Sequence, residues 1–337
     1  MGTKIRGIDF GPICGASGVQ GFFGDPRFPE YWHQHLFRYM PGYNFKGMSF
    51  TSKTSTALKR AGNMSLREDG IRVKHIRPRC IETALRQGVV LNAVGLSGPG
   101  FEKLLLENRW QKREKPFRIS FMAVGQSLEE KVKETKLFAS LMKKHLPSFK
   151  TKEIMIQFNI TCPNVGIKPS AEGLRDVEEV RMLIDILAEI GLALEVKVSA
   201  VMDPYVVREI ASHEACDSVC VSNTIPWSKL EDMISWRKLF RLQGEGSHVT
   251  LEESPLKQFG GGGLSGWPLL QIVSRWIREF RAIGFEKHIN AGGGIMSRDD
   301  VYVMKYAGAD SVFIGSVAVL RPWRVKGIIR EARRAFT

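Results

Sequence analysis

Polar and reactive side chains stand at the ends of several short apolar segments. In Asn159-Ile-Thr-Cys162-Pro-Asn164, a thiol and two amides leave one such segment and enter a loop punctuated by Pro and Gly. An amide can both donate and accept hydrogen bonds, and a thiol whose pKa is lowered by nearby cations can accept a proton or attack as a nucleophile. Comparable positions are held by Lys53, Asn92, Lys197 and Asn223. Together these residues predict an active site in which the thiol acts either as a proton acceptor or as a nucleophile.

Taken singly, each of these residues has a simpler explanation. An Asn after a strand is commonly a turn residue. Lys197 lies within the apolar segment 194–198, where a buried ammonium group needs an anionic partner. That partner is either a cofactor that becomes negative on reduction or a carboxylate such as Glu195. A lone cysteine is commonly a small buried hydrophobe, which is how we interpret Cys14, Cys80, Cys216 and Cys220.

Three glycine-rich segments lie near the end of the chain, at 259–266, 290–295 and 314–316. Loops of small residues let backbone N–H groups approach a phosphate, and the last loops of a strand–helix barrel are a common phosphate site. The alternative is that the four consecutive glycines of 260–263 form only a flexible linker. We favour the phosphate site because the other two segments fall where a shared phosphate would need them.

Alternating strands and helices must position these residues. From residue 117 onward, short apolar segments alternate with amphipathic ones, which is typical of a parallel sheet. Helices are predicted at 128–146, 176–190 and 269–283, and another begins at Ser297, with Asp300 as its near capping box. Strands are predicted at 11–17, 47–52, 89–94, 117–124, 153–159, 192–198, 218–221, 286–290 and 311–315.

The pattern favours an α/β fold of the (β/α)8 TIM-barrel type. A barrel has eight strands, so one of the first three segments is expected to be short or to lie outside the ring. A doubly wound open sheet is the competing architecture, but no G-x-G-x-x-G opens a helix near the start. We predict a single barrel domain over residues 1–337 with an insertion around 226–260.

Composition limits the functional class. The 337 residues are 43% hydrophobic and 25% charged, as in an ordinary globular chain. No stretch approaches the roughly 18 apolar residues that cross a membrane, and the five scattered cysteines form no C-x-x-C pair, so we predict no metal site and a reducing, cytoplasmic setting. The 49 Lys and Arg against 35 Asp and Glu leave a charge of +14, which suits nucleic acid, an acidic membrane surface or an anionic small molecule.

The motifs, in order, closely resemble those of the dihydroorotate dehydrogenase family. They are SKTSTALKRAGN, LNAVGLSG, FNITCPNVGIKPS, VKVSA, SNT, GGGGLSG and NAGGGI. The resemblance runs from Ala16 to Ser316, and Cys162 is similar to the soluble cysteine-type class, whereas a membrane-attached class has Ser and an added apolar N-terminal segment. It implies an FMN-binding barrel, a flavoprotein oxidoreductase of pyrimidine biosynthesis that oxidises (S)-dihydroorotate to orotate.

The resemblance also implies a role for each matching residue. Cys162 would take the C5 proton of dihydroorotate while hydride leaves C6 for the flavin, and Lys53 would lie against both. The substrate would be held by Asn92, Asn159, Asn164 and Asn223, and its carboxylate by the backbone N–H groups of Val94, Gly95 and Leu96. FMN would be bound by Ala16, Ser17, Gly18, Lys53, Lys197, Thr224, Gly266, Gly293, Gly294, Gly315 and Ser316, with Lys197 stabilising negative charge on the flavin.

Three departures from the family pattern leave alternatives open. Ser97-Gly98 stands where Pro-Asn is common, residues 165–168 read Val-Gly-Ile-Lys where Val-Pro-Gly-Lys is usual, and segment 228–258 is longer than expected. The first bears on the substrate, the second on loop motion and the third on the acceptor or a partner.

Three other functions remain as alternatives to dihydroorotate oxidation. They are a dihydrouridine synthase-like enzyme acting on RNA, a dihydropyrimidine-reducing FMN barrel enzyme, and a non-catalytic FMN-binding scaffold.

The resemblance suggests fumarate as electron acceptor and a homodimer as the assembly. An NAD-linked form of the family works with a separate iron–sulfur partner chain, so that acceptor stays open. We expect neither a membrane nor nucleic acid as a partner, because Lys53 and Lys197 serve the site and the remaining cations suit solvated faces.

Overall fold

Eight short parallel strands form a ring at the centre of the protein, whose computed structural model describes residues 4–161 and 173–336. Their order round the sheet is β3, β14, β13, β10, β9, β8, β7 and β4. The ring closes between β4 and β3 through Ser49, the residue just before β4. Gly15 N donates to Ser49 O at 3.0 Å, and Ser49 N donates to Ile13 O at 2.9 Å. The predicted TIM barrel is confirmed. Its strands are β3 (Ile13–Gly15), β4 (Phe50–Thr51), β7 (Phe117–Phe121), β8 (Ile154–Asn159), β9 (Ala193–Val198), β10 (Ser218–Val221), β13 (His288–Ala291) and β14 (Ser311–Ile314).

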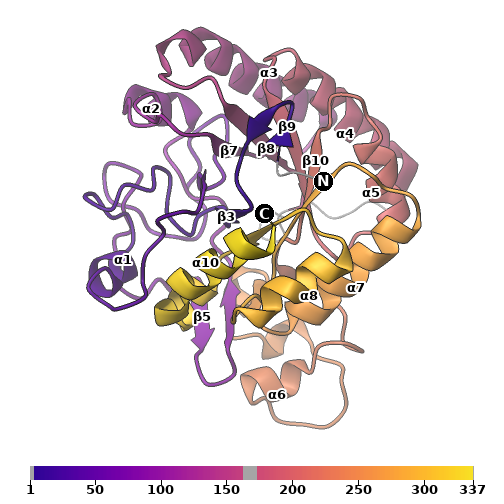
Figure 1. Ribbon diagram of the computed structural model, residues 1–337. Helices are drawn as coiled ribbons and strands as arrows, with labels where there is room; N and C mark the ends of the chain where they lie inside the picture. Colours follow the sequence, from indigo (N-terminus) through magenta and orange to yellow (C-terminus); the bar gives the residue numbers. More distant parts are fainter. Residues whose placement is uncertain (1–3, 162–172, 337) are drawn as a thin grey trace.

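Helices cover the outside of the ring (Figure 1). Their ends follow from local chemistry: the Ser127 hydroxyl accepts the Glu130 N–H at the start of α3, and Gly308 takes the left-handed conformation that ends α8. The Asp300 carboxylate accepts the Met296 and Ser297 N–H groups, so α8 begins at Asp299 and not at Ser297 as predicted. The covering helices are α3 (Leu128–His145), α4 (Gly173–Ala188), α5 (Pro204–Ala211), α7 (Leu269–Ala282), α8 (Asp299–Ala307) and α10 (Val325–Ala335).

The strand predicted at 89–94 lies outside the ring of eight, as expected for one of the first three predicted strands. Strand β6 (Val89–Asn92) pairs antiparallel with β5 (Ile81–Ala84) and with β12 (Gly263–Gly266), and β12 pairs with β11 (Ile225–Pro226). Part of the predicted phosphate loop 259–266 is therefore a strand. Glycine is needed there because a Cβ added at Gly266 would lie 2.4 Å from the Gly88 carbonyl oxygen.

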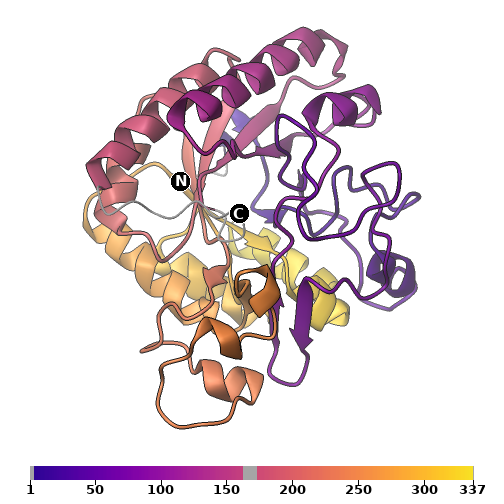
Figure 2. The same cartoon turned by 180° about the vertical axis from the view of Figure 1, so that it is seen from behind.

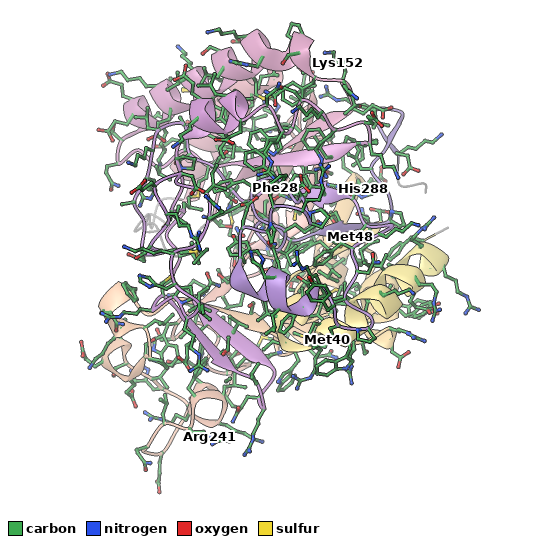
Figure 3. The ribbon with its side chains drawn as sticks, turned by 90° about the vertical axis from the view of Figure 1, so that its left-hand side faces the viewer. Phe28, Met40, Met48, Lys152, Arg241 and His288 are labelled. Atoms are coloured by element: carbon green, nitrogen blue, oxygen red, sulfur yellow. The ribbon has the colours of Figure 1, made fainter. Side chains whose placement is uncertain are left out.

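The segment 226–260 projects from the barrel beside β5 and β6 (Figure 2). Its core is aromatic: the Trp227 and Trp236 ring centroids lie 4.8 Å apart, and Trp227 Nε1 donates to Thr250 O at 2.8 Å. In Figure 3, Arg241 lies at the outer end of this segment, away from His288 in the barrel. The segment contains α6 (Trp236–Phe240), η3 (Leu251–Glu253) and η4 (Lys257–Phe259). That residues 1–337 form one domain with an insertion here stays a prediction.

The remaining elements are short. They are β1 (Lys4–Ile5), β2 (Ile8–Asp9), α1 (Trp32–Phe37), α2 (Phe101–Leu106), η1 (Leu146–Ser148), α9 (Val317–Leu320) and η5 (Pro322–Arg324). Among the helices that the structure describes, none has the length and apolar character needed to cross a bilayer.

The interior of the barrel holds a buried ion pair. Arg118 on β7 and Glu195 on β9 are 1% and 0% exposed, and Arg118 Nε lies 3.5 Å from Glu195 Oε1. Glu195 also accepts hydrogen bonds from Gln157 Nε2 at 2.7 Å and Asn290 Nδ2 at 3.3 Å. The Arg118 guanidinium donates to Ser49 Oγ at 3.1 Å. The barrel floor is therefore polar and charged, and its acid is fully engaged.

Candidate active site

A cavity of about 1100 Å³ opens at the carboxyl ends of the barrel strands. Because parallel strands end at the same edge, polar residues that follow different strands meet there. The predicted residues that line it are Ala16, Ser17, Gly18, Lys53, Asn92, Val94, Gly95, Leu96, Asn159, Lys197, Asn223, Thr224, Gly293, Gly294, Gly315 and Ser316.

The structure leaves three predicted residues without a place in the cavity wall, two of them because the structure does not describe them. Cys162 and Asn164 lie outside the described residues. Gly266 ends the strand that pairs with β6 and packs on the Gly88–Val89 backbone, so its predicted contact with a phosphate stays untested.

Two buried amides form a pair across the ends of β8 and β10. Asn223 Nδ2 donates to Asn159 Oδ1 at 2.7 Å and to Thr161 Oγ1 at 2.8 Å, and the two side chains are 9% and 4% exposed. Within the described residues, the other end of each amide, Asn159 Nδ2 and Asn223 Oδ1, makes no hydrogen bond. The pair thus offers the cavity one donor and one acceptor, which suits a ring edge with both C=O and N–H groups.

The turn after β6 presents a row of backbone donors. Gly95 and Leu96 have φ values of 67° and 60°, a left-handed conformation that turns successive N–H groups to one side. Arg60 Nε donates to Gly95 O at 3.0 Å and Asn63 Nδ2 to Ala93 O at 2.7 Å, which fixes the turn from behind. In the part of the chain that the structure describes, the N–H groups of Val94, Gly95 and Leu96 have no acceptor. Such a turn suits a carboxylate.

Lys53 reaches this turn from the end of β4. Its Nζ donates to Ser97 O and lies 4.7 Å from the centroid of the Phe22 ring. Burial lowers the pKa of Lys53 to about 8, against the opposing effects of Glu30 and Cys80. A cation therefore lies beside the row of N–H donors, which strengthens the site's preference for an anion.

Lys197 lies at the end of β9 and is 7% exposed. The alternative that Glu195 is its partner is wrong, because Glu195 is engaged by Arg118, Gln157 and Asn290. No carboxylate among residues 4–161 and 173–336 forms an ion pair with Lys197, and its Nζ lies 5.8 Å from the centroid of the Phe313 ring. A buried ammonium group in this position calls for an anionic ligand.

The loops after β13 and β14 bring further backbone donors to the cavity. Gly293, Gly294, Gly315 and Ser316 line it, and within the described chain their N–H groups donate to no acceptor. Gly294 must be glycine, because φ is 80° and a Cβ would lie 2.4 Å from Leu270 N. These donors fit a phosphate group, as the sequence predicted for this end of the barrel.

Two residues near the site, Ser97 and Glu30, have no role predicted from the sequence. Ser97 fixes the donor turn, since its hydroxyl accepts the Met64 N–H at 3.0 Å and its carbonyl accepts from Lys53. Glu30 accepts the N–H of Phe22, whose ring contacts Lys53. The sequence around Glu30 contains no motif that indicates a functional residue. Ser97 could have been found from its place beside Leu96, whereas Glu30 gave no signal. In the described chain, no group of three or more His, Cys, Asp or Glu residues is placed to hold a metal ion.

Comparison with known proteins agrees with the motifs. A family model described as dihydroorotate dehydrogenase matches residues 44–335. The catalytic subunit of dihydroorotate dehydrogenase B (NAD(+)) from Streptococcus pneumoniae (strain ATCC BAA-255 / R6) is 26% identical over 332 residues, which covers 98% of this chain and 90% of that relative. Dihydroorotate dehydrogenase A (fumarate) from Lactobacillus helveticus (strain DPC 4571) is 27% identical over 256 residues, 74% of this chain and 73% of the relative.

A solved structure is similar in fold. The crystal structure of DHODH from Eimeria tenella in complex with ferulenol has a TM-score of 0.65 and 18% sequence identity, and the match covers 99% of this chain and 86% of that chain. The likeness therefore extends over the whole barrel.

Proposed function

Because the chain belongs to the dihydroorotate dehydrogenase family, we propose that it oxidises (S)-dihydroorotate to orotate with FMN as cofactor. The observation that carries the proposal is the cavity, which is lined by a turn with backbone N–H donors, an amide pair, a buried lysine without a carboxylate partner in the described chain, and glycine-rich loops. No structural requirement of a barrel demands that combination.

The cavity fits FMN by its chemistry. We assign the phosphate to the N–H groups of Gly293, Gly294, Gly315 and Ser316, which have no acceptor in the described chain. Ala16, Ser17, Gly18 and Thr224 would line the flavin. When bound, FMN supplies the acceptor for the hydride that leaves C6 of the substrate. The Lys197 ammonium group would offset the negative charge that arrives with it.

The protein's own residues bind and deprotonate the substrate. The N–H groups of Val94, Gly95 and Leu96 would hold the carboxylate, and Asn159 and Asn223 would hydrogen-bond the ring edge, with Asn92 and Asn164 as further amides. Cys162 would remove the C5 proton as a thiolate, and the Lys53 cation would favour that thiolate.

In the proposed site, the Lys197 charge stabilises the reduced, negatively charged form of the flavin, so its loss should make the flavin harder to reduce. We expect Lys197→Met to lower the midpoint potential of bound flavin by roughly 30–60 mV, one to two factors of ten for a two-electron couple. Anaerobic dye-equilibration titration measures this potential. Lys133→Met, which removes an exposed ammonium group on α3, is the control and should leave it unchanged. Equal potentials in all three proteins would remove Lys197 from the flavin site.

The acceptor and the assembly complete the proposal. We propose fumarate as acceptor and a homodimer; the names of the relatives include both a fumarate and an NAD(+) type. To test the function, the protein is given dihydroorotate and an artificial electron acceptor, and the orotate formed is measured by chromatography. The same assay with fumarate or NAD⁺ in place of the artificial acceptor tests which acceptor the protein uses. Consumption of dihydrouracil or NADPH without any orotate from dihydroorotate would contradict the proposal. If orotate formed with NAD⁺ after a partner chain was added, and did not form with fumarate, the proposed acceptor would be wrong and the proposed oxidation of dihydroorotate would stand.

A further inference from the structure

Glu30 is a buried carboxylate to which the proposed chemistry gives no role. It is 4% exposed and lies just before α1. One oxygen accepts the Phe22 N–H at 2.6 Å and the other accepts the Phe23 N–H at 2.8 Å. Hydrogen bonds to an ionised acceptor are stronger than neutral ones, so Glu30 fixes the backbone of residues 21–23.

The 21–23 turn that Glu30 binds is the surface against which Lys53 rests. Lys53 N donates to Gly21 O at 2.8 Å, and Lys53 Nζ lies 4.7 Å from the Phe22 ring centroid. Gly21 makes room for the acid, because a Cβ there would lie 2.3 Å from Glu30 Oε2. Trp110 Nε1 donates to Phe22 O at 2.7 Å and holds the turn from its other side.

Within the described residues, few titratable groups act on Lys53 and Glu30. Lys53 faces Glu30 and the Cys80 thiol, and Glu30 faces Lys53 and Arg109, with Tyr31 beside it. Burial raises the pKa of Glu30 to about 7, opposed by the N–H groups of the turn and by both cations. Burial also raises the pKa of the Cys80 thiol, which therefore stays neutral near pH 7. Among the described residues, Glu30 is thus the acid whose ionisation near neutral pH acts on Lys53.

We propose that Glu30 is a positioning residue that holds the 21–23 turn against Lys53 and keeps its ammonium group charged at the cavity wall. Glu30 and Lys53 form no direct ion pair within the described residues, so the effect passes through the turn and through space. The use of a charged Lys53 rests on the proposed function, whereas the link between Glu30 and Lys53 does not.

The test measures Lys53 itself, in FMN-free protein. Acylation of the Lys53 amine by acetic anhydride, quantified by peptide mass spectrometry from pH 6 to 10, reports the fraction of neutral amine. In Glu30→Gln we expect the midpoint of this curve to fall by roughly half a unit to one unit, because an opposing negative charge is lost. Glu82→Gln is the matched control, since Glu82 lines the same cavity from β5 without binding the turn, and it should leave the midpoint unchanged. A Glu30→Gln protein with wild-type thermal unfolding and a wild-type midpoint would overturn the proposal.

The wild-type protein supplies an independent measurement. Its acylation curve should be broader than the curve of a single isolated amine, because Glu30 also titrates near pH 7. A curve that fits a single isolated amine overturns the proposal even if Glu30→Gln fails to fold. If dihydroorotate does not reduce the flavin, the proposed function fails, but the acylation result still decides the role of Glu30.

Discussion

Cys162→Ala is expected to slow the reduction of bound FMN by dihydroorotate by roughly 10²–10⁴-fold and to leave FMN bound, because the proposed mechanism gives Cys162 the role of proton acceptor and gives it no part in cofactor binding. The chain leaves β8 at Asn159, whose amide lines the cavity, and Cys162 follows three residues later. In the proposed mechanism, the Lys53 cation favours a thiolate at this position. Stopped-flow absorbance of the flavin under anaerobic conditions measures the rate.

The control for this variant removes a different thiol. Cys216 is buried, with Sγ 3.4 Å from Ser218 O, and does not line the cavity. Cys216→Ala should therefore reduce flavin at the wild-type rate. A wild-type rate in Cys162→Ala would remove Cys162 from the mechanism, whatever the substrate.

Glu195→Ala is expected to lower the free energy of unfolding by about 3–5 kcal/mol, because it leaves the Arg118 guanidinium buried without its acid. Arg118 is 1% exposed and cannot regain water without opening the barrel. Urea unfolding of FMN-free protein measures the loss. The double variant Arg118→Met/Glu195→Leu should lie closer to wild type, since it buries no unpaired charge.

An exposed ion pair provides the comparison for Glu195. Glu189 pairs with Lys143 at 3.0 Å, with side chains 66% and 45% exposed. Glu189→Ala should change the free energy of unfolding by about 0–1 kcal/mol, because water screens the pair. If Glu195→Ala cost no more than Glu189→Ala, the ion pair would not be a structural element of the barrel floor.

The sequence predicts the barrel well because each of its strands is a short apolar segment with polar residues at its end. Strand β6 looks like the others in the sequence, yet it pairs with β12, which the sequence suggests is a loop. Tertiary contacts decide that β6 lies outside the ring and that the segment of β12 is a strand. The four consecutive glycines at 260–263 show no alternation of apolar and polar residues that would predict a strand there. Pairing along the sheet, not local propensity, decides that case.

The candidate site was predictable where side-chain type and position coincide. Lys197 is a charge inside an apolar segment, and the structure shows it buried without a carboxylate in the described chain. Glu30 was not predictable, because its role depends on a turn formed by residues eight positions earlier and on Lys53 further along the chain. Nothing about a single Glu before a short helix indicates that arrangement.

The most direct test of the proposed function is anaerobic addition of dihydroorotate to the purified flavoprotein. We expect the flavin absorbance to bleach and one orotate to appear for each flavin reduced. The account would be contradicted if dihydroorotate left the flavin oxidised while dihydrouracil or NADPH reduced it.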